Sequence, residues 1–497
     1  MKKLIVLVLL SIFCDIIYSQ QNDIESWEQR NRAEREAFLK RANEEYSNFR
    51  DRVNAEYAEF VRRTGWEFNR SFSEIPVPKL PDPPKPVFIP EEEKDRIPEN
   101  NCIPYEVVIP APVFLEQPNP IAPVPEIPVL EKIPFHFKLF GTECKVRLTD
   151  EHRFTLRNCN ENSIADAWQK LSQPQYNNVI RDCLEMRTNL NLSDWAYLHM
   201  LQQLSSDFLG CGSNEAALLS AFLFCQSGYK MRLARSNSNR LYFMVASRHG
   251  IYSMRYYTID GEKYYPLNCN EDELYICNIS FPNELPLCLT IGKEQCFAMK
   301  RTEARTLSSK RYPHVTTNVE VNQNLIDFYN TYPQSFINDD GYSKWIFYAN
   351  APISQLVKET LYPVLKNAIS GKSEQEAGNI LINFVQTAFE YGYDDEIWGE
   401  DRPFFPDETI FYPFSDCEDR AILFSRLIRD LMGLKVVLIY YPGHLATAVQ
   451  FNENIPGDYL TANGKRFLVC DPTYIGARIG KTMPNMDNSN VKVILLD

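Results

Sequence analysis

The stretch Ser415-Asp-Cys-Glu-Asp-Arg-Ala421 begins an amphipathic segment that runs to Gly433. Apolar residues recur in this segment at three- and four-residue steps, which predicts a helix, and Gly433 is a typical helix stop. Cys417 then lies in the first turn, where exposed amide hydrogens and the helix dipole favour a thiolate. Its acidic neighbours oppose ionisation by charge repulsion. As a nucleophile, Cys417 would therefore need a base close by.

Strands are predicted after this helix, and two of them carry residues that could complete such a site. His444 opens a strand that continues to residue 451, and Asp471 ends the next strand, which starts at residue 465. If the two strands pair as an antiparallel hairpin, Asp471 lies beside His444 and can orient its imidazole.

The alternation of a strand places His444 on the same face as Ala446 and Ala448. We expect these small side chains to let the Cys417 helix approach the imidazole closely. Taken singly, a cysteine at a helix start or a histidine at a strand end is more often a packing residue. The order of nucleophile, base and orienting carboxylate is what favours catalysis here.

These motifs, Asp416-Cys-Glu-Asp-Arg-Ala421, Pro442-Gly-His444 and Asp471-Pro-Thr473, resemble those of the transglutaminase-like superfamily. That superfamily has a papain-like Cys-His-Asp arrangement and includes protein cross-linkers, cysteine peptidases and glycopeptide amidases. The resemblance covers about residues 311–497. It implies Cys417 as nucleophile, His444 as base and Asp471 as orienting carboxylate, with no metal or organic cofactor.

Two further points follow from the resemblance. The family's second oxyanion donor lies upstream of the cysteine, and Gln386 and Trp398 are the residues considered for it. After the histidine the family commonly has a small residue and then an aromatic one, whereas this chain has Leu445-Ala446. This departure leaves open whether the site is active and whether water or an amine is the acceptor.

The preceding part of the chain repeats the same layout of helix, loop, helix, glycine stop and strands. Placing 216–234 over 421–439 without gaps matches six residues, among them Gly228 with Gly433. The shared order of elements indicates an internal duplication. The predicted helices of the first copy are 194–208 and 216–224, and its strands are 229–234, 241–247, 251–258 and 264–267, with a hairpin turn at Asp260-Gly261. In the second copy, a helix is predicted over 375–391 and strands over 435–440, 445–451 and 465–470.

The first copy lacks the cysteine, histidine and aspartate of the candidate catalytic site. In the ungapped register Gly212 falls opposite Cys417, and Cys211 reaches that position only by a one-residue slip. Asn239 falls at the histidine position and Pro266 at the aspartate position. His249 lies in a predicted turn, and we expect it to be a surface residue. We therefore expect a catalytically silent first domain.

The N-terminus predicts export. Lys2 and Lys3 precede an apolar run, Leu4 to Phe13, that is too short to span a bilayer, and Ser19-Gln20 offers a small-residue cleavage point. No later stretch of about 18 apolar residues follows. We expect a bacterial-type secreted protein, periplasmic or extracellular. A lipid anchor through Cys14 is not favoured, because the residues before it are not small.

Two segments separate this signal from the folded domains. Residues 20–72 carry one apolar stripe on a predicted helix, Leu39, Ala42, Tyr46, Phe49, Val53, Tyr57 and Phe60. This stripe predicts either a partner helix for residues 23–70 or a helix docked on its own protein. Residues 73–134 hold 17 of the 32 prolines, which predicts an extended spacer or a tether lying over the surface.

Charge and cysteine content narrow the function classes. The net charge is −13, which argues against a nucleic-acid partner. Twelve cysteines follow Cys14 without C-x-x-C spacing, which disfavours zinc ribbons and thioredoxin-type motifs. Some of them could form disulfides in an oxidising compartment, with no connectivity given by the sequence.

The expected protein is α+β: a signal peptide (1–19), a long helix (20–72), a Pro-rich linker (73–134), a degenerate transglutaminase-like domain (135–310) and a catalytic one (311–497). Its expected function is that of a thiol acyl-transfer enzyme that hydrolyses peptide or amide bonds of a protein or peptide substrate. The alternatives are a non-catalytic binding or scaffold protein and a true cross-linking transglutaminase.

Overall fold

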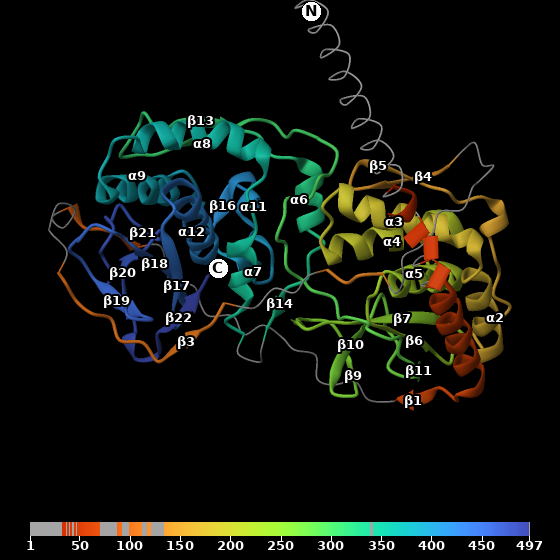
Figure 1. Cartoon of the computed structure of the whole chain (residues 1–497). Helices are drawn as coiled ribbons and strands as arrows, with labels where there is room; N and C mark the ends of the chain where they lie inside the picture. Colours follow the sequence, from red (N-terminus) through yellow and green to blue (C-terminus); the bar gives the residue numbers. More distant parts are fainter. Residues whose placement is uncertain are drawn as a thin grey trace, which may run out of the picture.

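The computed structural model describes residues 32–69, 87–91, 99–111, 117–120, 134–337 and 341–496, apart from 36, 39, 42, 43 and 46. The chain is α+β and forms two lobes, with α2–α5 and β6–β11 in one and α8, α9, α12 and β17–β22 in the other (Figure 1). The predicted signal peptide lies outside the described residues. Within them, no helix combines the length and the apolar character needed to cross a membrane.

Each lobe is built on a six-stranded sheet, and the two sheets have the same strand order. The first is ordered β9 (Tyr257–Ile259), β10 (Glu262–Pro266), β7 (Leu241–Ala246), β6 (Met231–Arg235), β11 (Leu274–Cys277) and β1 (Glu67–Asn69). The second is ordered β19 (Tyr459–Ala462), β20 (Lys465–Cys470), β18 (His444–Gln450), β17 (Lys435–Tyr441), β22 (Lys492–Leu495) and β3 (Val107–Ile109). Both outer strands, β1 and β3, come from the segments before the lobes. The outer strands differ in direction, since β1 runs antiparallel to β11 and β3 parallel to β22. The shared strand order supports the internal duplication.

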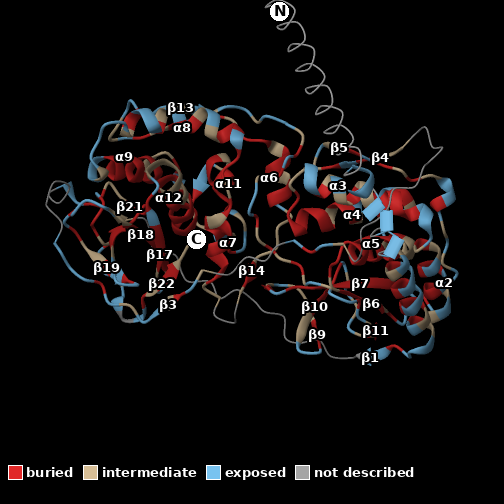
Figure 2. Cartoon of the chain, in the orientation of Figure 1, coloured by how far each residue is buried: buried red, intermediate tan, exposed pale blue. Residues whose placement is uncertain are grey.

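The helices repeat as well. In the first lobe, α4 packs on α5, which covers β6 and β7; in the second, α9 packs on α12, which covers β17 and β18. The strands of both sheets are mostly buried (Figure 2). The helices of the first lobe are α2 (Glu161–Leu171), α3 (Asn177–Asn189), α4 (Asp194–Leu209) and α5 (Asn214–Gln226). Those that follow are α6 (Gln323–Tyr329), α7 (Lys344–Asn350), α8 (Gln355–Ile369), α9 (Glu374–Thr387), α10 (Asp394–Ile397), α11 (Pro406–Phe411) and α12 (Cys417–Met432).

Several elements depart from the sequence-based expectations. The predicted strand 251–258 is two short strands, β8 (Gly250–Ile251) and β9, because the chain turns between them with Ser253 at a positive φ of 56°. The boundary predicted at 310 is crossed by a hairpin, β12 (Arg305–Ser308) with β13 (Thr316–Val319). Arg305 donates hydrogen bonds to carbonyls of the second lobe at residues 410–413, so this hairpin contacts the second lobe.

The remaining short strands were not predicted. They pair as β4 (Phe135–Leu139) with β5 (Thr142–Val146), β2 (Val87–Phe88) with β21 (Tyr474–Ile475), β14 (Ser335–Phe336) with β8, and β15 (Glu390–Tyr391) with β16 (Phe414–Ser415). The β14–β8 pair links the two lobes. Next to it, His249 is buried against the Phe347 ring, so the expectation of a surface histidine is wrong.

The twelve cysteines after Cys14 are all free thiols.

The segments before the lobes lie on them. Residues 47–63 are helical, and the helix ends before 72 because the chain turns into β1. Val53 and Tyr57 are buried on the first lobe, whereas Phe60 is 55% exposed. The Tyr57 ring lies 4.5 Å from the Trp168 ring, so the helix packs on its own chain. Leu39, Ala42 and Tyr46 of the predicted stripe have no described side chains.

The Pro-rich segment is described only in part, and those parts contact both lobes. β2 and β3 add parallel strands to the second lobe. Pro118 is buried, and its carbonyl accepts a hydrogen bond from Arg187 of the first lobe. The described parts therefore lie over the surface as a tether does.

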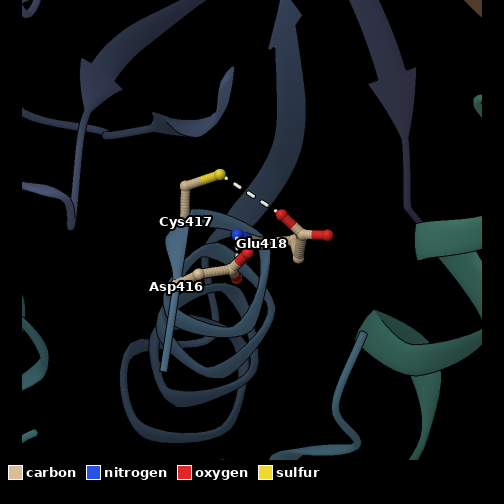
Figure 3. A group of neighbouring side chains, drawn as sticks. All are labelled: Asp416, Cys417 and Glu418. Carbon is tan, nitrogen blue, oxygen red and sulfur yellow. Dashed lines mark hydrogen bonds between the residues drawn. The ribbon is translucent and has the colours of Figure 1, made fainter. Parts of the chain in front are cut away.

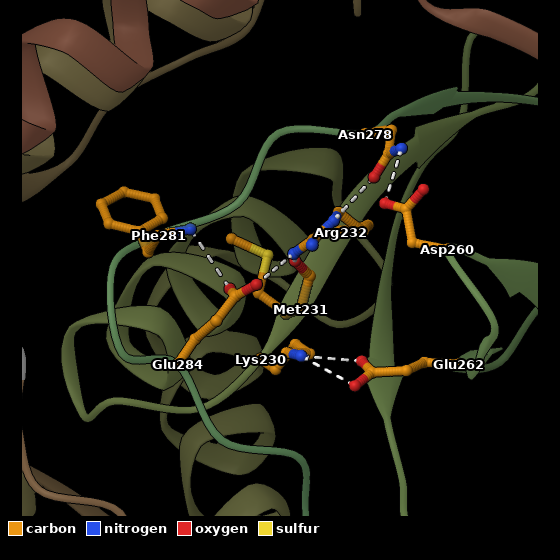
Figure 4. A network of polar contacts seen from close by, with 8 residues as sticks. All are labelled: Lys230, Met231, Arg232, Asp260, Glu262, Asn278, Phe281 and Glu284. Atoms are coloured by element: carbon orange, nitrogen blue, oxygen red, sulfur yellow. Dashed lines mark hydrogen bonds and ion pairs between the residues drawn. The ribbon is translucent and has the colours of Figure 1, made fainter.

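A polar network fixes the edge of the first sheet (Figure 4). The buried Arg232 on β6 pairs with Glu284 at 2.9 Å, and both side chains are less than a tenth exposed. Its Nε also donates to Asn278, whose amide reaches Asp260 in the β9–β10 turn. Buried charges of this kind are tolerated because they are paired and hydrogen-bonded. The network is structural and has no counterpart of the Cys-His-Asp set.

Candidate active site

The start of α12 is held by a reciprocal cap. The Asp416 carboxylate accepts hydrogen bonds from the amides of Glu418 and Asp419, and the Asp419 carboxylate accepts one from the Asp416 amide. Such a box satisfies amides that would otherwise lack partners at a helix start. The cap leaves the amide of Cys417 unused. Cys417 is therefore the first helical residue, as predicted, on a rigidly fixed turn (Figure 3).

Arg420 fixes the same turn from the other side. It is 1% exposed, and its guanidinium donates to the Ser415 hydroxyl and to the carbonyls of Gln386 and Phe389. Burial lowers its pKa to about 10. The residues on either side of Cys417 are thus tied to the end of α9, which makes Arg420 a positioning residue.

His444 and Asp471 meet at the end of the second sheet. β18 and β20 pair antiparallel, with Thr447 opposite Cys470, which brings the start of β18 beside the end of β20. His444 Nε2 lies 2.9 Å from Asp471 Oδ2, and both side chains are buried. His444 Nδ1 is also buried and has no hydrogen-bond partner among the described residues. An Nε2–H that donates to Asp471 leaves the Nδ1 lone pair available as a base.

Cys417 lies in a setting that opposes its ionisation. It shares a buried core with Leu445, the residue that follows His444, and α12 packs on β18. The thiol proton points to Glu418, with 3.2 Å between Sγ and Oε2 (Figure 3). Burial, and then the charges of Glu418 and Asp416, raise the pKa of the Cys417 thiol well above its usual value. A base is therefore required for attack at neutral pH.

The expected role of Ala446 and Ala448 is wrong. Both pack on the face of the sheet with Val437 and Ile439, whereas Leu445 and Val449 share a core with Cys417 and α12. His444 is the first residue of β18 and therefore lies at the end of the strand. The alternation of residues along a strand predicts which face of the sheet the histidine side chain lies on. It does not predict the side from which a helix packs.

Glu418 is the centre of a buried acidic cluster. Burial works to raise its pKa, but the Lys344 ammonium and hydrogen bonds from Asp416, Asp401 and Cys417 outweigh burial and lower it. One carboxylate oxygen each of Asp394, Asp401 and Glu418 lies within 4.8 Å of the others, a spacing that would suit a hard cation. Lys344 already forms an ion pair with Asp401 in this cluster, so the chain supplies its own counter-charge.

Asp394 makes the stability of this region depend on pH. Burial and the Glu418 charge raise its pKa to about 8, whereas an unfolded aspartate titrates near pH 4. The folded protein thus binds more protons between those values, and its free energy of unfolding falls as pH rises, by at most about 1.4 kcal/mol per pH unit for this group. Denaturant titrations at several pH values should show that the free energy of unfolding falls less steeply with pH in Asp394→Asn than in the wild type. Asp395→Asn, an exposed neighbour, should keep the wild-type slope, and an equally steep decrease in Asp394→Asn would contradict this account.

Of the two residues considered as the second oxyanion donor, Gln386 is not free for that role. The Gln386 amide donates to the carbonyls of Asp471, Tyr474 and Ala477, and its oxygen accepts from Gly476, so Gln386 holds the loop after β20. The Trp398 ring packs on Phe404 and Tyr412.

Sequence reasoning missed Tyr393. Its hydroxyl is buried without a hydrogen-bond partner among the described residues. Burial, then the charges of Glu396, Asp395 and Cys417, raise its pKa. No motif marks a lone tyrosine in a loop, so the sequence carried no signal for it.

The element starts give a register between the two lobes that differs from the ungapped one. α5 begins at Asn214 and α12 at Cys417, so by helix start Asn214, and not Gly212, lies at the position of Cys417. In the same way Leu241, which opens β7, corresponds to His444. Leu267, which follows β10, corresponds to Asp471. Asn214 Oδ1 accepts a hydrogen bond from the Leu241 amide at 2.9 Å, so a structural contact occupies the place of the thiol.

No protein-family model, curated protein or solved structure matched the chain in the three comparisons.

Proposed function

We propose that the second lobe is a transglutaminase-like, papain-like catalytic domain of an exported protein and that the first lobe is its degenerate copy. The reaction is acyl transfer on a peptide or carboxamide carbonyl, with Cys417 as nucleophile, His444 as base and Asp471 as orienting carboxylate. The single observation that carries the proposal is the His444–Asp471 hydrogen bond, with Nδ1 left unpartnered beside the helix that begins at Cys417.

The proposed cycle uses Nδ1 twice. Cys417 Sγ attacks the carbonyl while its proton passes to Nδ1, and the leaving ammonia or amine then takes that proton. This step leaves a thioester on Cys417. Water, deprotonated by the same nitrogen, releases the acid product. Asp471 stabilises the imidazolium that forms in each half of the cycle.

The oxyanion of each tetrahedral intermediate needs two donors near Cys417. The Cys417 amide is one, because the cap does not use it. Tyr393 is proposed as the other. Tyr393→Phe should lower kcat about 10²-fold, the usual cost of one lost donor, with KM nearly unchanged. An unchanged kcat in Tyr393→Phe would remove it from the site.

We predict hydrolysis rather than amine transfer. Amine transfer needs a channel that excludes water and holds a lysine side chain, and the Leu445-Ala446 pair supplies no aromatic wall for one. The acidic run at 394–401 could attract an amine, but Asp394 and Asp401 are buried and Lys344 already forms an ion pair with Asp401.

The experiment is incubation with a glutamine-containing peptide and a labelled primary amine. Ammonia or peptide release should exceed amine incorporation. Incorporation that outpaces release would identify the protein as a cross-linker. If neither product forms, the result favours the second candidate function.

That second candidate is a non-catalytic binding or scaffold protein, and two observations favour it. Cys417 is 2% exposed, so a substrate carbonyl reaches it only if the site opens. Its thiol also donates to Glu418 and not to His444. The two candidates differ in whether His444 controls the reactivity of Cys417.

A further inference from the structure

A cavity of about 910 Å³ lies between the two lobes, away from Cys417. Its first-lobe wall comes from the α3–α4 connection and from residues 288–295, and its second-lobe wall from the last turn of α12 and the start of β17. Gln117 of the Pro-rich segment closes part of it. Its volume is that of a small-molecule site, and such sites occur preferentially between domains.

The charge of the lining is opposite to that of the protein. Five cationic side chains line the cavity, whereas the chain as a whole has a net charge of −13. These five residues are Arg187, Lys293, Arg426, Arg429 and Lys435. An accumulation of one sign in a concave, partly apolar space concentrates ligands of the other sign.

The one carboxylate in the described lining does not cancel this charge. Asp194 is buried, and its two oxygens accept hydrogen bonds from the Tyr229 hydroxyl and the Cys288 amide at 2.6 and 2.9 Å. Burial raises its pKa. Asp194 thus belongs to the wall of the first lobe. Arg426 is itself ion-paired with Asp430, and the other four cations keep an excess of positive charge.

Arg187 adds a donor that the protein leaves unused. It is 9% exposed, and its two terminal nitrogens donate to the Tyr229 hydroxyl and the Pro118 carbonyl, both neutral acceptors. Its Nε is buried without a partner among the described residues, as is that of Arg426. Arg187 thus has no carboxylate hydrogen-bond partner among the described residues, and its charge adds to the positive potential of the cavity.

Apolar side chains form the rest of the wall. Leu192, Ile291 and Leu434 line the cavity, and each is buried. A bare inorganic ion would leave these walls in contact with water, whereas an organic anion would cover them. We propose that this cavity is a binding site for a small organic anion with at least two carboxylate or phosphate charges. The inference goes beyond the proposed acyl transfer and does not depend on it.

The test is calorimetric titration of the full chain with citrate and, separately, with pyrophosphate, which distinguishes carboxylate from phosphate recognition. We expect saturable binding of at least one of them, weakened by added sodium chloride. Lys293→Glu with Lys435→Glu changes two exposed lining lysines and should weaken binding at least about tenfold. Lys465→Glu, an exposed lysine outside the cavity, is the matched control and should bind as the wild type does.

Failure to bind either anion would overturn the proposal. Equal affinity in the double variant and the wild type would also overturn it, because the anion would then sit elsewhere. The salt dependence of wild-type binding tests the proposal even if the double variant fails to fold. Binding that does not weaken with added salt would contradict a cationic site. None of these readings uses enzymatic activity, so they leave the proposed acyl transfer untouched.

Discussion

Cys417→Ala should abolish acyl transfer, with a loss of at least about 10⁴-fold in kcat/KM. The reason is that both halves of the proposed cycle pass through the thioester on its sulfur. The other thiol near the pair, Cys470, directly precedes Asp471 and donates to the Leu468 carbonyl. The measurement is release of ammonia or peptide from an unfolded protein substrate. Because Cys417 is buried at a fixed helix start, alanine leaves a small void without disturbing the cap.

Two cysteine variants serve as controls for this loss. Cys211→Ala changes an exposed residue of the first lobe and should retain full activity, since that lobe has no partner residues for a thiol. Cys470→Ala removes a buried thiol next to Asp471 and should change stability more than turnover. Activity near wild type in Cys417→Ala would rule out the mechanism.

The second large effect concerns the partners of the thiol. His444→Ala should cost nearly as much as loss of Cys417, because the thiol pKa is raised. The other acceptor in contact with the thiol, Glu418, has a lowered pKa and is a weak base. Asp471→Asn should be less severe by about tenfold to a hundredfold, since an amide still contacts Nε2 but does not stabilise the imidazolium. The pH profile of kcat/KM separates the two roles. Equal losses in both variants would mean that Asp471 does more than orient the ring.

Much of the second lobe was predictable because its signals are local. The helix from Cys417 to Gly433 and the strand that starts at residue 435 follow from periodicity and a glycine stop, and α12 ends with Gly433 at a φ of 68°. The hydrogen bond between His444 and Asp471 agrees with the antiparallel hairpin expected from the spacing of their strands.

What the sequence could not give is the tertiary environment. The acid cluster around Glu418 assembles residues from α10, α12 and the loop before α11, and its pairing with Lys344 on α7 depends on how those elements pack. The ungapped alignment of the two lobes misplaced residues for a similar reason. Helix α5 is three residues shorter than α12, so an alignment that matches the ends of these helices shifts their starts.

The most direct test of the central claim is the rate at which iodoacetamide alkylates Cys417 at neutral pH, followed by peptide mass mapping in wild type and His444→Ala. The account predicts that Cys417 reacts faster than the exposed Cys211 in the same sample and that His444→Ala removes this advantage while leaving the Cys211 rate unchanged. A Cys417 rate that does not exceed that of Cys211, or that is the same with and without His444, would contradict it.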